Sequence, residues 1–270
     1  MDKNLIIENA KKHFNGELLD IVIKQIERFF DILKSDYWIK HNYKIGDSVI
    51  LDNNHLLHGI GSHIDVLEMI SNRGVVSLDY FGEDSNHAFC YESAFWNVKG
   101  NITLKEYIEN YSGIVAKVNN QYWQVPYGKL DAFVEKMRAI DHWLWTAESS
   151  MEIRFMPSLA RDINQIGFII NLNDENGKML RNNSVFSDNF NKEYAFKFIN
   201  EKYRDKFKLN GFVDDFFYRA DYIIFGVPIN YFEGIIVGRK LEKDEDYLLK
   251  IKKIFPRCYI CNLDGEVIVE

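Results

Sequence analysis

Apolar residues recur at intervals of three and four positions along the first 34 residues of the chain. They are Leu5, Ile6, Ala10, Phe14, Leu18, Leu19, Val22, Ile23, Ile26, Phe29, Phe30 and Leu33. Residues with this spacing share one face of an α-helix. Because Asn15 and Gly16 interrupt the pattern, we predict two amphipathic helices that meet near these two residues.

Shorter apolar runs, separated by turn-forming residues, follow these helices. Residues 47–51 and 55–58 are expected to form short strands, because apolar and β-branched residues there flank the turn-forming residues 52–54. Residues 62–73 have a helical period, with Ser62 as the N-cap and Gly74 at the end of the helix. A strand is expected to begin at Val75.

The rest of the chain is rich in strand-like segments. Strands are expected at residues 87–96, 152–156, 166–172, 222–225, 233–238, 258–262 and 266–269, a hairpin at 114–118 and 122–125, and helices at 104–111, 128–145, 192–207 and within 239–253. No Ser/Gly-rich linker or internal repeat divides the chain. We predict an α+β fold with mixed or antiparallel sheets, in which a helical addition at residues 1–40 precedes a core domain at residues 41–270.

Composition and charge narrow the class of protein. With 47% hydrophobic residues among 270, the chain can bury a core, which excludes disorder of the whole chain. A formal net charge of −7 provides no overall positive field for nucleic acid or an anionic membrane. No apolar run approaches the roughly 18 residues of a membrane span, and the first residues form no signal peptide. We therefore expect a cytoplasmic protein without a membrane partner, and the Asn-, Lys- and Ile-rich composition suggests a bacterial or phage source.

The three cysteines do not indicate a disulfide framework, because their number is odd. Cys258 and Cys261 have the CxxC spacing, but they lie in a strand-like apolar run with no second cysteine pair. In thioredoxin-like proteins this motif begins a helix, and no helical pattern follows here. We expect both residues to be buried thiols.

The segment at residues 55–74 is the strongest indication of function. It begins with the apolar string His55-Leu56-Leu57-His58 and continues with Gly59, Ile60 and Gly61 into the predicted helix. Glycine lets a backbone approach a ligand closely, because it has no Cβ. A metal site formed by several histidines is disfavoured, since His55 and His58 would lie on opposite faces of a strand. His58 therefore remains as the candidate ligand contact, with a structural histidine at a turn as the alternative.

This segment resembles the ADP-ribosyltransferase-like superfamily, in which a strand ending in His-Gly-Thr or a variant contacts NAD and precedes a helix. The resemblance implies that His58, Gly59 and Ile60 bind NAD, with Ile60 in place of the usual small hydroxyl residue. It also implies that a later strand aromatic stacks on nicotinamide. Tyr91 is our choice for that residue, with Tyr80 and Phe89 as rivals.

A third element of this superfamily is a glutamate on a late strand, which supports the positive charge that develops as the glycosidic bond breaks. Glu233 corresponds to it by order and by strand context, although a solvent-facing strand end is an equal alternative for this residue. The resemblance thus implies an ADP-ribosyl transferase that consumes NAD as its substrate and needs no metal. The acceptor is unknown and could be a protein, a nucleic acid or a small molecule. The alternative function is a non-catalytic binding protein, such as an inactive relative or a partner in a defence or conflict system.

Overall fold

The computed structural model describes residues 1–81, 92–111, 113–118, 121–126, 151–152, 165–182 and 220–270. Two helices begin the chain, α1 (Lys3–His13) and α2 (Gly16–Lys34). The carboxylate of Asp2 caps α1 by accepting from the backbone N–H groups of Asn4 and Leu5. The prediction of two helices that meet near Asn15 and Gly16 is therefore confirmed.

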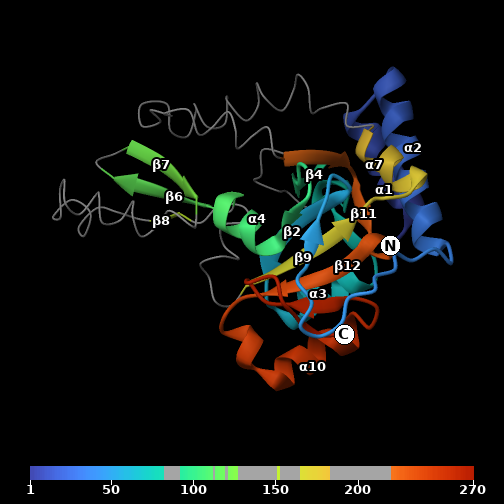
Figure 1. Cartoon of the computed structure of the whole chain (residues 1–270). Coiled ribbons are helices and arrows are strands. Elements are labelled where there is room, and N and C mark those ends of the chain that lie inside the picture. The colour runs from blue at the N-terminus through green and yellow to red at the C-terminus, as the bar shows by residue number, and fades with distance from the viewer. Residues whose placement is uncertain (82–91, 112, 119–120, 127–150, 153–164, 183–219) are drawn as a thin grey trace.

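A seven-stranded sheet forms the centre of the molecule (Figure 1). Its strands, in spatial order, are β10 (Ala220–Ile224), β4 (Glu92–Asn97), β2 (His55–Gly61), β9 (Gln165–Asn171), β12 (Phe232–Val237), β13 (Tyr259–Cys261) and β14 (Val267–Val269). All neighbouring pairs are antiparallel except β12 and β13, which are parallel. The predicted α+β class and the mixed sheet are confirmed.

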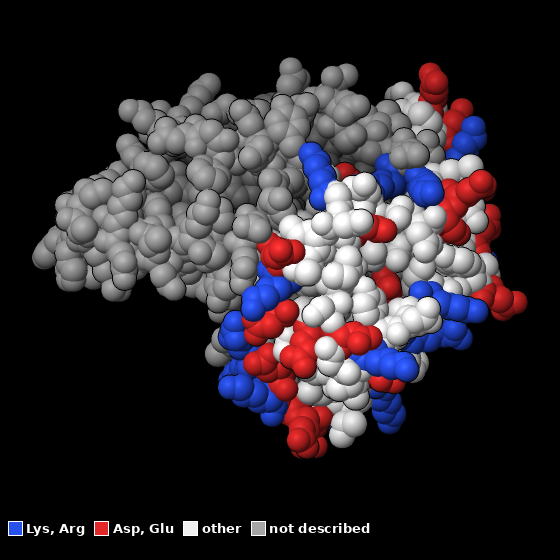
Figure 2. All heavy atoms as spheres, viewed as in Figure 1, with Lys and Arg blue, Asp and Glu red and all other residues white. Residues whose placement is uncertain are grey.

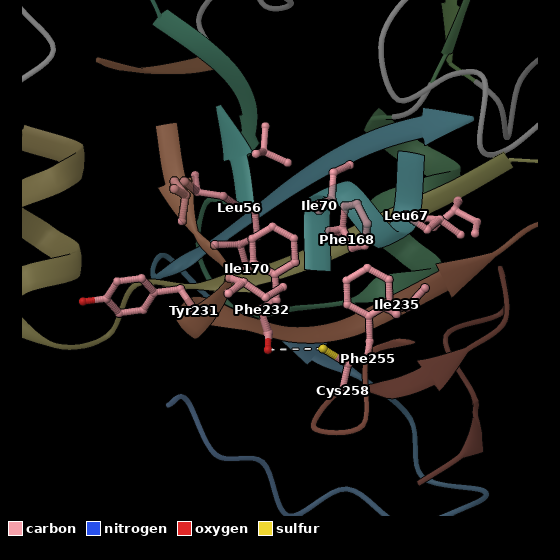
Figure 3. Packing of buried hydrophobic residues seen from close by; sticks show 14 of the residues in the cluster. Leu56, Leu67, Ile70, Phe168, Ile170, Tyr231, Phe232, Ile235, Phe255 and Cys258 are labelled. Carbon is pink, nitrogen blue, oxygen red and sulfur yellow. Dashed lines mark hydrogen bonds between the residues drawn. The ribbon is translucent and has the colours of Figure 1, made fainter. Parts of the chain in front are cut away.

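Three helices cover one face of the sheet, which we call the α10 face. They are α3 (Ile64–Ser71), α7 (Glu175–Asn182) and α10 (Glu245–Ile254). Buried residues of these helices pack on Leu56 of β2, Phe168 of β9 and Ile235 of β12, among others. Figure 3 shows the rings of Phe168, Phe232 and Phe255 gathered in this layer. Burial of these large apolar side chains is the main stabilising contribution on this side.

The opposite face, which we call the α4 face, is covered by α4 (Leu104–Tyr111) and by the small pair of strands β1 (Ile50–Leu51) and β5 (Ile102–Thr103). Its core includes Leu57, Ile169 and Ile236 from the central strands. Thr103 and Glu106 form a capping box, since the Thr103 hydroxyl accepts from the Glu106 N–H and the Glu106 carboxylate accepts from the Thr103 N–H. The predicted helix at 104–111 after a Thr103 cap is confirmed.

The α1 and α2 helices pack at one side of the sheet, where the rings of Phe29 and Phe30 contact that of Phe225. Ile6 and Ile224 belong to the same buried cluster. Two short strands, β3 (Gly74–Val76) and β11 (Gly226–Pro228), pair beside them. Short 3₁₀ turns complete the described part: η1 (Leu78–Phe81), η3 (Ile229–Tyr231) and η4 (Leu241–Lys243). The division of the chain at residue 40 stays a prediction.

A separate hairpin consists of β6 (Gly113–Val118) and β7 (Gln121–Pro126), with β8 (Met151–Glu152) added beside β6. In Figure 1 it projects to the left, beyond α4. The predicted hairpin at 114–118 and 122–125 is confirmed. The predicted helices at 128–145 and 192–207 lie outside the described residues.

Several element boundaries differ from the predictions. The helix expected from Ser62 begins at Ile64, with His63 at the N-cap position. The strands β1 and β2, on either side of residues 52–54, do not pair with each other: β1 pairs with β5, and β2 pairs with β4 and β9. The mixed-charge segment 239–253 divides into η4 and α10, because Asp244 caps the second helix through the Tyr247 N–H. The helix α7 was not predicted.

Both described cysteines are free, buried thiols, as predicted. Cys258 Sγ donates to the Phe232 carbonyl and Cys261 Sγ to the Ile235 carbonyl. The two residues belong to the cores on opposite faces of the sheet, which is why their CxxC spacing does not bring the sulfurs together.

The surface carries acidic and basic side chains side by side on the face shown in Figure 2, without a large region of one sign. The mixture is densest around α10, at the bottom of the view. Within the described part of the chain, no helix combines the length and apolarity that spanning a bilayer requires.

Candidate functional site

A buried polar network lies on the α4 face and centres on Glu233 and His55. Glu233 Oε2 is 3.0 Å from His55 Nε2 and accepts from Asn171 Nδ2 at 3.0 Å. The other ring nitrogen of His55, Nδ1, is 2.7 Å from Asp52 Oδ1. Only 8% of the His55 side chain and 6% of the Glu233 side chain are exposed, whereas that of Asp52 is 41% exposed. The network therefore runs from a partly exposed carboxylate to a buried one.

Strand register explains how His55 and Asn171 meet. They form a directly opposed pair between β2 and β9, so their side chains lie on the same face of the sheet. His55 lies two residues from Leu57, and Asn171 lies two residues from Ile169, so each pair shares one face of its strand. Leu57 and Ile169 belong to the α4-face core. Two polar residues thus stand at the end of an apolar stripe, where each needs a partner.

A β-bulge places Glu233 beside them. Phe232 pairs with Ile170 and Gly234 pairs with Ile169, so Glu233 is an extra residue in β12. Gly234 allows the close approach of β13, since a Cβ at this position would lie 2.4 Å from two ring carbons of Tyr259. The bulge and the glycine together turn the glutamate of an otherwise apolar strand toward His55.

The turn before β2 holds Asp52 in place. Asp52 Oδ1 accepts from the Asn54 N–H at 2.8 Å, and the Asp52 carbonyl accepts from the His55 N–H at 3.0 Å. This is the conformation of an Asx turn, which the residues 52–54 favour. The carboxylate is consequently fixed against the imidazole.

The two carboxylates set the charge of His55. Burial alone would lower the pKa of the imidazole, but the hydrogen bond and negative charge of Glu233, together with those of Asp52, outweigh burial and raise the pKa. Partial burial acts to raise the pKa of Asp52. The Asn54 N–H and the His55 charge outweigh it, so that the pKa of Asp52 is lowered. The arrangement therefore favours an imidazolium between two carboxylates.

Aromatic residues surround the network on the α4 face. The ring of Tyr259 packs edge-to-face against His41 and Tyr43, each with centroids 4.9 Å away. Burial, with the nearby Cys261 and Glu233, raises the pKa of Tyr259 well above its usual value, so its hydroxyl stays neutral. Among the described residues, the Tyr259 hydroxyl and Asn171 Oδ1 are buried polar atoms without a hydrogen-bond partner. Such atoms are costly unless something satisfies them.

His58 lies on the other face of the sheet. It follows His55 by three residues, so the two side chains alternate across β2, as the sequence predicted. The His58 ring packs against Phe95 of the α10-face core, with centroids 5.3 Å apart. His58, Gly59 and Ile60 are all partly exposed. The structure does not bring His58 and Glu233 together.

The predicted stacking aromatics lie elsewhere. Tyr91 and Phe89 are outside the described residues. Tyr80 is fully buried and packs edge-to-face on Phe225, 5.2 Å away, in the cluster that α1 and α2 form. A fully buried ring in that core has no free face for nicotinamide.

Sequence patterns did not indicate that His55 and Asn171 contact Glu233, or that Asp52 contacts His55. Two signals were available: a carboxylate in a buried apolar strand must be paired, and the odd spacing placed His55 on the face opposite His58. Within the described residues, no group of three or more His, Cys, Asp and Glu side chains is arranged to hold a metal ion.

Comparison with protein-family models, with curated proteins and with solved structures finds no match to the chain.

Proposed function

We propose that the chain transfers ADP-ribose from NAD to an acceptor, with Glu233 as the carboxylate that stabilises the positive charge on the ribose. The observation that carries the proposal is the position of Glu233, a carboxylate in a bulge of an apolar strand, oriented by donors from β2 and β9. A carboxylate held in this way needs no reorganisation when charge develops beside it. The sequence resemblance supplies the reaction class.

In the proposed reaction the bond between nicotinamide nitrogen and ribose C1′ breaks, and its electron pair leaves with nicotinamide. A nucleophile of the acceptor forms the new bond to C1′ and gives up its proton. Glu233 stabilises the oxocarbenium-like state between these events, while His55 and Asn171 hold the carboxylate.

One NAD molecule cannot contact both His58 and Glu233 in this arrangement, because they lie on opposite faces of one sheet. The proposal therefore places the reacting ribose on the α4 face. The assignment of His58, Gly59 and Ile60 to NAD binding is an alternative that requires the α10 face instead.

The second candidate is a non-catalytic binding protein. It is favoured by the burial of Glu233 and by the two internal donors that already occupy Oε2, an arrangement that also suits a purely structural network. An inactive relative with this architecture would bind NAD or another partner without turnover.

Two measurements separate the two candidates. The first is the rate of nicotinamide release from NAD by the wild-type chain and by Glu233→Ala. The second is NAD binding to both chains, measured by calorimetry. Turnover that Glu233→Ala reduces by about 100-fold or more, the scale of a lost electrostatic stabiliser, supports the transferase. Binding without turnover supports the non-catalytic protein. Absence of NAD binding by the folded wild-type chain refutes the transferase. Glu68→Ala, an exposed glutamate of α3, is the matched control.

A further inference from the structure

Asp52 presents two different groups to the same nitrogen of His55. Its carboxylate oxygen Oδ1 lies 2.7 Å from Nδ1, and its backbone N–H lies 2.9 Å from Nδ1. The first group is an acceptor and the second is a donor. One nitrogen cannot satisfy both at once, because Nδ1 either carries a proton or offers a lone pair.

Each group matches one protonation state of the ring. In the imidazolium, Nδ1–H donates to Asp52 Oδ1 and Nε2–H donates to Glu233 Oε2. In the neutral ring protonated at Nε2, the bond to Glu233 persists and Nδ1 accepts from the Asp52 N–H. The turn therefore has a partner for Nδ1 in either state, while Glu233 keeps its donor in both.

We propose that His55 is a positioning residue whose Nδ1 proton sets the charge of the Glu233 site without releasing the glutamate. This regulation rests on the function proposed above, because it acts on the same Glu233 site. With the imidazolium, Asp52, His55 and Glu233 together carry one net negative charge. Loss of the Nδ1 proton leaves two negative charges beside the reacting ribose, which stabilise an oxocarbenium-like cation more strongly.

The groups around His55 permit this titration. Asp52 faces it from the turn and Glu233 from β12, while Asn171 of β9 is neutral. Tyr43 from the preceding segment and Tyr259 and Cys261 from β13 surround the network. Burial is the largest cause that raises the pKa of each of these three groups, so they stay neutral across the range in which His55 titrates.

The signs for stability and for activity are opposite. Because the pKa of His55 is raised by folding, its contribution to stability is complete below the unfolded pKa and is lost as the pH rises through the folded pKa. The contribution of Asp52, whose pKa is lowered, is lost as the pH falls through its folded value. As the pH rises through the folded pKa of His55, the free energy of unfolding should therefore fall and turnover should rise.

A ¹⁵N-imidazole NMR titration of the full chain tests the inference. The expected result is that His55 Nδ1 loses its proton at a higher pH than histidine does in the urea-unfolded chain, while Nε2 stays protonated throughout. Deprotonation at Nε2, or a folded-state pKa of His55 no higher than that of histidine in the unfolded chain, overturns the inference. This readout needs neither NAD nor a variant.

Two variants connect the titration to function. Asp52→Asn keeps the backbone donor and removes the partly exposed carboxylate, so the His55 pKa should fall. His55→Gln keeps a neutral donor for Glu233, and its turnover should lose the rise with pH that the wild type shows. His63→Gln should retain that rise. A wild-type pH profile without the rise, or one that His55→Gln leaves unchanged, overturns the inference. If wild type has no turnover while Nδ1 titrates as expected, the proposed function fails and the two-state imidazole stands.

Discussion

Replacing Glu233 by alanine removes the centre of the buried network. The Glu233 carboxylate accepts from His55 Nε2–H and from Asn171 Nδ2, each at 3.0 Å. The variant would leave the imidazolium with one carboxylate instead of two and Asn171 without an acceptor. The positive charge of the imidazolium would stay buried, because only 8% of the His55 side chain is exposed.

The expected loss is large for a single substitution. Removing one partner of a buried ion pair costs about 3–5 kcal/mol, because the other charge stays buried. The two lost hydrogen bonds, one of them from a charged donor, cost about 1–3 kcal/mol each. Their sum is similar to the cost of breaking the ion pair. For a chain of this size, about 2–4 °C in Tm per kcal/mol gives a decrease of roughly 6–20 °C.

Thermal and urea unfolding at pH 6, where the imidazolium is present, measure this loss. Glu233→Gln should lose less than Glu233→Ala, because its amide oxygen still accepts from His55. The exposed control Glu68→Ala should change the free energy of unfolding by no more than about 0.5 kcal/mol. If Glu233→Ala is as stable as the control, the buried network does not stabilise the fold.

Three further substitutions and reactions test the surroundings of the site. Gly234→Ala should lower the free energy of unfolding by about 1–3 kcal/mol, because its Cβ would overlap the buried Tyr259 ring. An unchanged urea midpoint would contradict the close approach of β12 and β13. Cys258 and Cys261 should resist thiol reagents at pH 8 in the native chain and react after unfolding, because burial raises the pKa of Cys258 to about 12 and also raises that of Cys261; mass spectrometry would identify any native labelling. Thr103→Ala should cost about 1 kcal/mol by removing the cap of α4, as measured by chemical denaturation.

Local patterns predicted the helices and most strands because their causes are local. The periodicity of the first 34 residues determines which face of α1 and α2 is buried, and the Thr103 and Glu106 pair caps α4 through side chains three residues apart. The α7 helix was missed because its sequence is mostly polar and glycine is its third residue. Leu180 is its one fully buried apolar residue among those whose burial is described, and it joins the α10-face core. Tertiary packing stabilises this helix more than its own sequence does.

The site was only partly predictable. Alternation along β2 correctly separated His55 from His58. The alternative that Glu233 is a solvent-facing strand end is wrong, because only 6% of its side chain is exposed and His55 is its partner. The identity of that partner depends on strand order and on a bulge between residues 232 and 234, which join positions 178 residues apart. Neither the order of distant strands nor the register of a bulge is determined by short-range patterns.

In the function proposed above, NAD occupies the α4 face beside Glu233. The imidazoles of His55 and His58 lie on opposite faces of β2 and therefore report directly on the position of the ligand. The imidazole NMR signals of His55 and His58 should be followed while NAD is added to the wild-type chain. We expect the His55 signals to shift with saturable dependence on NAD and those of His58 to stay in place. Shifts at His58 alone would place the ligand on the α10 face, and no shift at either histidine would contradict NAD binding at this strand.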